Sequence, residues 1–367
     1  GLSDLHGHLT CISEFDLSIS GLYYFDAQRQ KNCEETLKSG CTFVRDSGGA
    51  YVPTKYLQDE IEADRLLGPK IMPSYEVMTP RKGMWDVNPI ANVLGPMIFG
   101  GPMLNFLSSD DSIEQCMAKL NNMGSESFKT YFEEKPLYGK TDNTNYHMFT
   151  PKQAKLFRKN ADKYNKIIEA HSMFIKGSRC VIDAGFDSLA HMTVDAPYTL
   201  NDAKKMVKHS TAIVPTLSVG SYLAMDCGNA GFPNNPEFLY FSEKLKTEVV
   251  KNINRVTIPE LRNNYLHFVH WIQKTMQNRK MPSVGQVYPD RCHGFMVHAK
   301  ESFCNFQEAG TKVGIGTDGG TGVTFVGQLG TEFETFQRYG YSPAQILRMA
   351  TLGNMEIVNR DKELGSI

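Results

Sequence analysis

Short apolar runs alternate with amphipathic helical stretches along most of the chain. The strand-like runs are residues 2–8, 41–48, 70–78, 127–132, 166–172, 186–192, 211–218 and 312–320. Helical spacing of apolar positions is typical of stretches that lie between them, such as 27–40, 112–124, 150–165 and 199–210. This alternation predicts an α/β fold with parallel strands. Eight such runs favour a (β/α)8 TIM barrel over an open doubly wound sheet.

Local signals agree with this pattern. Thr150 and Pro151 are a good N-cap and first-turn pair, and Gly40 and Gly124 stand where a helix C-cap glycine is expected. No G-x-G-x-x-G motif follows the first run, which further disfavours a dinucleotide-binding sheet. We therefore interpret residues 1–367 as one barrel domain.

One interval between expected strands is too long for a simple connection. Residues 219–311 separate the seventh and eighth runs, and Leu245, Val249 and Ile253 within it fall on one helical face. We expect a helical insertion over the barrel mouth. Ordinary outer helices joined by one long loop are the equal alternative.

Composition and charge exclude several classes of partner. The chain is 41% hydrophobic and 22% charged with a formal net charge of −1, which describes an ordinary globular protein. That charge gives no electrostatic reason to expect nucleic acid or an anionic membrane surface. No apolar run reaches the roughly 18 residues of a membrane span. The expected partner is a small-molecule substrate, and homo-oligomerisation stays open.

The pattern of cysteines indicates the redox environment of the protein. Eight cysteines are scattered without a C-x-x-C pair, which indicates free thiols in a reducing, cytoplasmic setting. Their even number keeps a secreted, disulfide-bearing protein as the alternative. The chain starts at Gly1, so we expect a processed or cut N-terminus, and a removed signal peptide stays compatible with it.

Residues able to bind metal gather at the ends of the expected strands. A lone His-x-His is weak evidence, but His6 and His8 share one strand face because the strand period is two. TIM barrels build their sites at the carboxyl ends of their strands. Six candidate residues on five strands are expected to converge there: His6, His8, Lys129, His171, His191 and Asp318.

The motifs carrying these residues resemble a known family. The stretches "GLSDLHGH", "CTFVRDSGG", "EAHS", "FDSLAHM", "PTLS" and "GIGTDGG", in this order, are similar to the amidohydrolase superfamily, above all to its imidazolonepropionase-like and prolidase-like branch. The closing "ATLGNMEIVNRDKELGSI" is similar to that family's last helix. Members also carry a small flanking β-sandwich built from segments before the first strand and after the last helix. We expect residues 1–367 to be the barrel without this sandwich, either as an excised barrel or with the flanking residues lying outside this sequence.

The resemblance implies a centre with two divalent metal ions. His6, His8 and Asp318 would hold one ion, and His171 and His191 the other. Lys129 would carry a carboxyl group derived from CO2 and bridge both, because a free ammonium has no lone pair to offer a cation. Imidazole and carboxylate ligands suit zinc, with manganese, iron and cobalt as open alternatives.

The implied reaction is hydrolysis of an amide bond. A water on the two ions would supply hydroxide as the nucleophile, and Asp318 would act as general base and then general acid. We expect a dipeptide or an N-acyl amino acid as substrate. The alternatives are a cyclic amidohydrolase of the imidazolonepropionase type and a catalytically silent binding scaffold. A deaminase is disfavoured because Glu169, two residues before His171, is a poor match to the glutamate that class uses.

Other residues are weaker candidates. Tyr222, soon after "PTLS", and His147, in a polar loop, are expected to contact substrate. Arg45 and Asp46 are expected to form a structural pair beneath the site. Trp85 either walls the substrate pocket or anchors a turn.

Overall fold

The computed structural model describes residues 1–10, 19–86, 101–135, 146–219, 289–320 and 326–366. Its strands form two parallel sheets. The first has the order β1-β2-β3 and comprises β1 (Leu2–Gly7), β2 (Cys41–Asp46) and β3 (Lys70–Pro73). The second has the order β5-β4-β6-β7-β8-β9. It comprises β4 (Val77–Pro80), β5 (Leu104–Leu107), β6 (Ser127–Tyr131), β7 (Ile167–His171), β8 (Ser188–Ala190) and β9 (Ala212–Val214). The predicted parallel α/β fold is confirmed.

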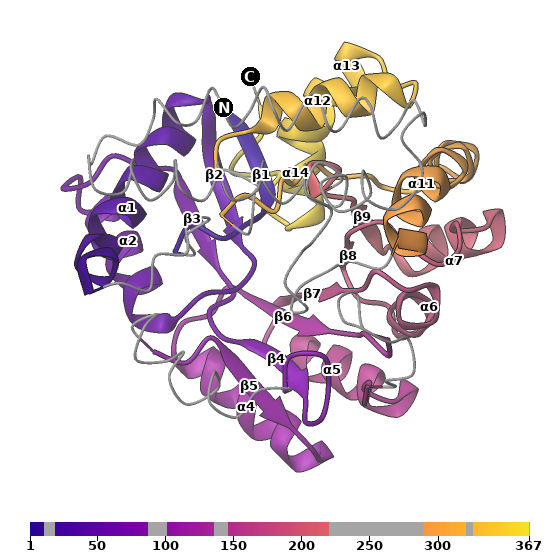
Figure 1. The fold of residues 1–367 in the computed structure, drawn as a ribbon, viewed down its shortest axis with the longest axis horizontal. Helices are drawn as coiled ribbons and strands as arrows, with labels where there is room; N and C mark the ends of the chain where they lie inside the picture. The colour runs from indigo at the N-terminus through magenta and orange to yellow at the C-terminus, as the bar shows by residue number, and fades with distance from the viewer. Residues whose placement is uncertain (11–18, 87–100, 136–145, 220–288, 321–325, 367) are drawn as a thin grey trace.

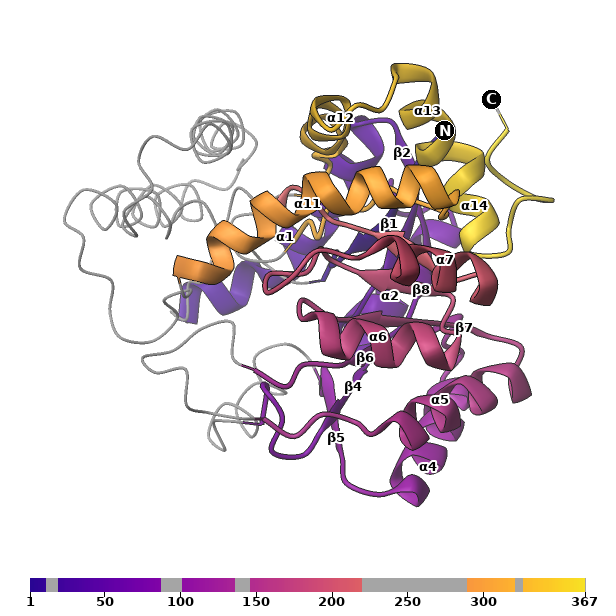
Figure 2. The same ribbon diagram turned by 90° about the vertical axis from the view of Figure 1, so that its right-hand side faces the viewer.

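Helices surround the strands (Figures 1 and 2). α1 (Ile19–Lys38) follows β1, α2 (Tyr51–Glu62) follows β2, and α4 (Asp110–Asn122) follows β5. α5 (Pro151–Lys163), α6 (Ile175–Ala184) and α7 (Leu200–His209) alternate with β6 to β9. The C-terminal part contains α11 (Pro289–Ala309), α12 (Leu329–Arg338), α13 (Pro343–Arg348), a π-helical turn (Met349–Gly353) and α14 (Asn354–Ile357).

The expected helix caps are present. The Thr150 hydroxyl accepts a hydrogen bond from the Gln153 backbone amide, and the Gln153 side-chain oxygen accepts one from the Thr150 backbone amide. Pro151 lies in the first turn. Gly124 follows α4 with φ +86°, a conformation that favours glycine. These local signals fix where the helices start and end, and so where the strands between them finish.

Two expected strands differ in the structure. The run 70–78 is divided into β3 and β4, because Tyr75 adopts a left-handed φ of 54° between them. β5 lies at 104–107, in a region without an expected strand. Tyr75 is 1% exposed and its hydroxyl donates to Gln58, so packing holds the bend. The pattern of apolar residues does not predict a bend of this kind.

The segment 312–320 is the largest correction. It is not a regular strand but makes isolated parallel bridges, Val313 to Ile213 and Gly319 to Gly7. The Leu5 amide also donates to the Ile315 carbonyl at 3.0 Å. A Cβ on Gly316 would lie 2.5 Å from Val214 and 2.9 Å from the His6 nitrogen, so glycine permits this close approach. The segment therefore lies between β9 and β1 and hydrogen-bonds to both.

The interval 219–311 is described only in part. α11 packs against the start of α7, where the Ser302 hydroxyl accepts from the Tyr198 amide at 3.0 Å and Asn305 donates to the Tyr198 carbonyl at 2.8 Å. The expected helical face at Leu245 and its neighbours lies outside the described residues. Among the described helices, none combines the length and apolar character that crossing a bilayer requires. Cys33, Cys41, Cys116, Cys180 and Cys304 are free thiols.

Candidate metal centre

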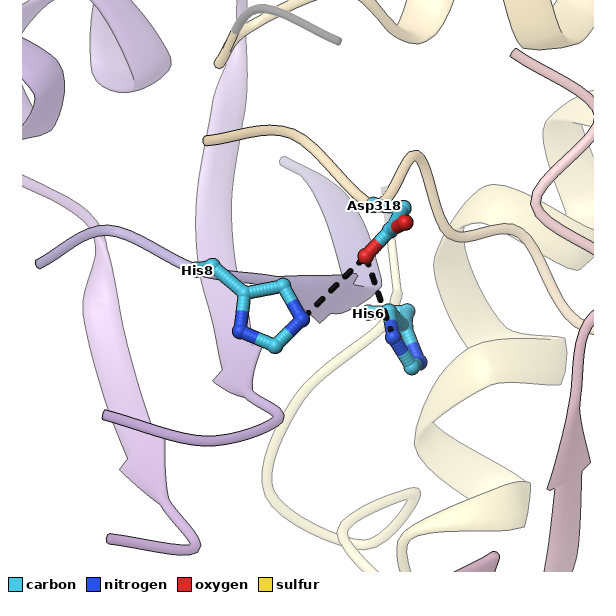
Figure 3. A group of neighbouring side chains, drawn as sticks. All are labelled: His6, His8 and Asp318. Atoms are coloured by element: carbon cyan, nitrogen blue, oxygen red, sulfur yellow. Dashed lines mark ion pairs between the residues drawn. The ribbon is translucent and has the colours of Figure 1, made fainter. Parts of the chain in front are cut away.

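The structure brings the first and last of the candidate residues into contact. His6 lies in β1 and His8 directly follows this strand, and both rings point toward Asp318 of the 312–320 segment (Figure 3). A single oxygen of Asp318, Oδ1, lies 3.3 Å from His6 Nε2 and 3.1 Å from His8 Nε2. These three side chains offer ligand atoms that all lie within 4.8 Å of one another. Such spacing fits one shared metal ion.

The remaining candidates continue the cluster from neighbouring strands. The His191 ring lies 4.9 Å from the His6 ring and 4.4 Å from the His171 ring, measured between centroids. Lys129 Nζ is 3.4 Å from His6 Nε2. All six residues expected to converge are therefore linked by direct contacts at the carboxyl ends of the strands.

Three imidazoles are held through Nδ1. His6 Nδ1 lies 2.7 Å from Glu169 Oε1, and His8 Nδ1 lies 2.8 Å from the Gly48 carbonyl. His191 Nδ1 lies 2.6 Å from the Thr216 hydroxyl. An imidazole held at one nitrogen presents the other as a ligand in a fixed tautomer. For these three histidines the ligand atom would be Nε2.

His171 is held from the opposite side. Its Nε2 lies 3.0 Å from Glu133 Oε1, within ion-pair range although the angle does not make a hydrogen bond. Glu133 is itself fixed, because its Oε1 accepts from the Met173 amide at 2.5 Å. The nitrogen of His171 left to act as a ligand is therefore Nδ1.

Electrostatics keeps these rings in the form that binds metal. Burial, and then the neighbouring charges of the cluster, lower the pKa of His171 and of His191 well below the usual histidine value. Both imidazoles are neutral at pH 7 as a result. A neutral imidazole has the lone pair that a metal ion requires.

Lys129 is the only lysine among the six, and it is 1% exposed. Burial lowers its pKa to about 8, with Glu169 acting in the opposite direction and Arg45 in the same one. A fraction of this amine is uncharged at neutral pH, and an uncharged amine is the form that can react with CO2. The buried lysine fits the carboxylated ligand that the resemblance implies.

Glu169 is the main site residue that sequence reasoning missed. Its carboxylate contacts His6, and it also lies 3.0 Å from the Ser47 hydroxyl and 3.4 Å from Lys129 Nζ. Burial alone would raise its pKa, but Arg45 and Lys129 outweigh burial and hold the pKa well below the usual range. The period-two spacing of Glu169 and His171 in β7 is the signal that places both on one strand face.

The expected Arg45–Asp46 pair is wrong. Arg45 Nη2 lies 2.9 Å from Glu169 Oε1, while its Nε donates to the Leu5 carbonyl at 2.7 Å. Asp46 instead accepts from the Leu9 amide at 3.2 Å. The strand alternates faces, so these two sequence neighbours point to opposite sides of β2.

Three site residues have a strained backbone. His191, Thr216 and Asp318 adopt φ angles of 77°, 48° and 59°, the left-handed region that non-glycine residues rarely occupy. Thr216 is β-branched, which makes its conformation the most costly of the three. Strain of about 1–3 kcal/mol per residue persists only where surrounding contacts impose it, and it gathers at functional sites.

Tyr131 and Trp85 form an aromatic surface beside His171. The Tyr131 ring lies 4.5 Å from the His171 ring, and the Trp85 ring lies 5.6 Å from that of Tyr131. Trp85 is 40% exposed. His147 is also exposed, and its amide donates to the Lys82 carbonyl at 3.0 Å in the same loop region. The expected substrate contact Tyr222 lies outside the described residues.

Comparison with known proteins adds family and fold. The model of the amidohydrolase family matches residues 1–367. Ochratoxinase from Aspergillus niger is 24% identical over 177 residues, which span 46% of this chain and 36% of the ochratoxinase. The chain thus covers little more than a third of that relative's length.

Solved structures share the fold over the whole chain. A prolidase complexed with N-methylphosphonate-L-proline has a TM-score of 0.68 at 19% identity, covering 100% of this chain and 76% of the prolidase. A Xaa-Pro dipeptidase with methionine bound in its active site has a TM-score of 0.68 at 18% identity, covering 100% and 77%. The A. niger ochratoxinase structure has a TM-score of 0.65 at 19% identity, covering 100% and 73%.

Proposed function

The chain belongs to the amidohydrolase family, and on that premise we propose that it is a metal-dependent hydrolase of a carbon–nitrogen amide bond. The observation that carries the proposal is the convergence of four imidazoles, one buried lysine and one carboxylate from five parts of the chain. Folding gains nothing by gathering such polar groups, since each loses hydration on burial. A catalytically silent scaffold gives no reason for this set.

We propose further that the two sheets are parts of one closed (β/α)8 barrel. Two sets of contacts support closure: the bridges of segment 312–320 to β9 and β1, and the Glu126 amide, which donates to the Pro73 carbonyl at 2.9 Å. The second contact joins the end of β3 to the start of β6. In such a barrel, side chains at the strand ends surround one axis.

The proposed ligand sets follow from the contacts. His6, His8 and Asp318 would hold one divalent ion, and His171 and His191 the other, with carboxylated Lys129 between them. Zinc suits the nitrogen-rich donor set. Bound here, two such ions would lower the pKa of a water and polarise the substrate carbonyl.

The chain's own residues would do the rest. Asp318 contacts His6 and His8 through Oδ1, and its other oxygen points away from both rings (Figure 3). We assign to this carboxylate the proton of the attacking water. The same carboxylate would return the proton to the leaving nitrogen. Glu169 and Thr216 would hold the His6 and His191 rings in a single orientation.

We propose a dipeptide or an N-acyl amino acid as the substrate. The similar structures include a prolidase and a Xaa-Pro dipeptidase, which favours such substrates over the cyclic amides of the imidazolonepropionase type. The aromatic surface of Trp85 and Tyr131 beside His171 would contact an apolar side chain next to the scissile bond.

The test combines metal content with turnover. Protein loaded with zinc is assayed for bound metal by elemental analysis and against a panel of dipeptides and N-acyl amino acids. We expect two ions per chain and turnover of at least one substrate, with His191→Ala losing one ion. His209→Ala, on the outer helix α7, is the matched control and should keep both. Fewer than one ion per chain in the wild type would refute the metal centre.

Lysine carboxylation has its own readout. Protein loaded in the presence of 13C-labelled bicarbonate should show one carbamate carbon resonance, which Lys129→Ala removes. Absence of that resonance in protein holding two ions would refute the bridging role.

A further inference from the structure

Glu332 is a buried acidic residue to which the proposed hydrolysis assigns no role. It is on α12, is 0% exposed, and its Oε2 has no hydrogen-bond partner among the described residues. A buried carboxylate without a counter-charge is costly. The side chain therefore requires an explanation.

Its other oxygen contacts Ser218, just beyond β9. Glu332 Oε1 accepts from the Ser218 amide at 2.5 Å and lies 2.7 Å from the Ser218 hydroxyl. That hydroxyl also contacts the Thr317 carbonyl closely. Ser218 thus lies between a carboxyl group and a backbone carbonyl, two groups that normally only accept.

A count of protons favours a protonated Glu332. The Ser218 hydroxyl has one hydrogen, and the Thr317 carbonyl has none to give. If that single hydrogen goes to Thr317, the 2.7 Å contact with Glu332 Oε1 is a hydrogen bond when Glu332 carries a proton and donates it to Ser218. Then Ser218 donates to Thr317, and the chain of donors is complete.

The electrostatics is consistent with that count. Burial raises the pKa of Glu332 to about 8. Hydrogen bonds from Ser218 and from the Leu217 amide lower this pKa, and the nearby Asp4 in β1 raises it. Asp4 is held in turn by the Thr317 amide at 3.0 Å and by the Thr317 hydroxyl. Thr317 is fixed from two sides.

The contacts lead directly to the strained residues of the centre. Thr317 precedes Asp318, and Ser218 follows Thr216 by two positions; both of these neighbours have left-handed backbones. Thr216 orients His191. One buried acid therefore ties together the two segments that present a proton acceptor and an imidazole.

We propose that Glu332 is a positioning residue that acts as a neutral carboxylic acid and, through Ser218, holds Asp318 and Thr216 in place for catalysis. The positioning role rests on the proposed hydrolase function. The protonation of Glu332 does not, because it is argued from the contacts between Glu332 and Ser218.

Variants separate the neutral acid from a charged one. Glu332→Gln keeps a donor in place of the acid proton, so kcat should stay within about 3-fold of the wild type. Glu332→Ala and Ser218→Ala both break the chain of donors, and kcat should fall about 10- to 100-fold with KM changed less than about 2-fold. Glu334→Ala, exposed on the same helix, is the matched control and should match the wild type.

An infrared measurement tests the proton without any substrate. Wild-type protein at pH 6 should show the carbonyl band of a protonated carboxylic acid that is absent from Glu332→Gln. This band does not depend on turnover. A failure of the proposed hydrolase function can therefore be distinguished from a failure of the proposed protonation of Glu332. A missing band, or a Gln variant as impaired as the Ala variant, would overturn the neutral acid. Full activity of both Ala variants would overturn the positioning role. If Glu332→Ala does not fold, Ser218→Ala and the infrared band still decide the question.

Discussion

Replacing Arg45 by methionine should destabilise the protein more than the loss of any surface ion pair. Arg45 is 0% exposed, lies 2.9 Å from Glu169, and donates to the Leu5 carbonyl at 2.7 Å and to the Ser188 hydroxyl at 3.0 Å. Methionine fills much of the same volume but leaves Glu169 charged and buried. Removing one partner of a buried ion pair lowers the free energy of unfolding by about 3–5 kcal/mol.

Urea denaturation followed by circular dichroism measures this change in the free energy of unfolding. Arg179→Met is the matched control, because Arg179 pairs with Asp202 at 2.9 Å but its side chain is 45% exposed. Exposed pairs contribute about 0–1 kcal/mol.

A double-mutant cycle sharpens the test. In Arg45→Met combined with Glu169→Gln the uncompensated charge is gone, so the two losses should be less than additive by at least about 1 kcal/mol. A loss below about 1 kcal/mol in Arg45→Met, or strictly additive losses, would refute the reasoning that Arg45 compensates Glu169.

Three further predictions concern the centre itself. Asp318→Asn should abolish turnover while most of the bound metal stays; full activity in this variant, measured with metal content, would exclude its proton transfer. Trp85→Ala should raise KM about 10-fold for substrates with an apolar side chain and leave kcat nearly unchanged; an equal effect on glycine-containing substrates would argue against the aromatic surface. In metal-free protein, the free energy of unfolding should fall as the pH drops below about 6.5, because unfolded histidines bind protons there and buried His171 and His191, with their lowered pKa values, do not. Equilibrium unfolding between pH 7.5 and 5 measures this slope, which His191→Gln should reduce; a flat profile would contradict the buried neutral rings.

The six candidate residues were accessible from the sequence for a physical reason. His6, His171 and Asp318 each end a short apolar run, and in parallel α/β folds the ends of such runs meet on one side. The residues that hold these side chains in place could not be predicted from the ends of apolar runs. Glu169 contacts His6 across 163 positions of sequence, and only the register between strands brings them together.

Departures from the expected strands have a similar origin. Tyr75 bends the chain within an apolar run because its ring and hydroxyl are held by tertiary contacts, which composition does not reveal. The apolar pattern of residues 312–320 predicts a strand, but the segment makes isolated bridges to Ile213 and Gly7 instead of a continuous ladder. Apolar patterning predicts that a segment is buried and extended; its pairing depends on neighbours far away in the chain.

The link between Asp4 and Thr317 has a consequence for the order of folding. These residues are 313 positions apart, and their hydrogen bond joins β1 to the 312–320 segment. Contacts that close such long loops form late, because the entropy of loop closure must be overcome first. Capacity to capture a metal ion should therefore emerge only in the final kinetic phase of refolding. Nascent chains that stop before residue 318 would present His6 and His8 without the carboxylate that completes their ligand set.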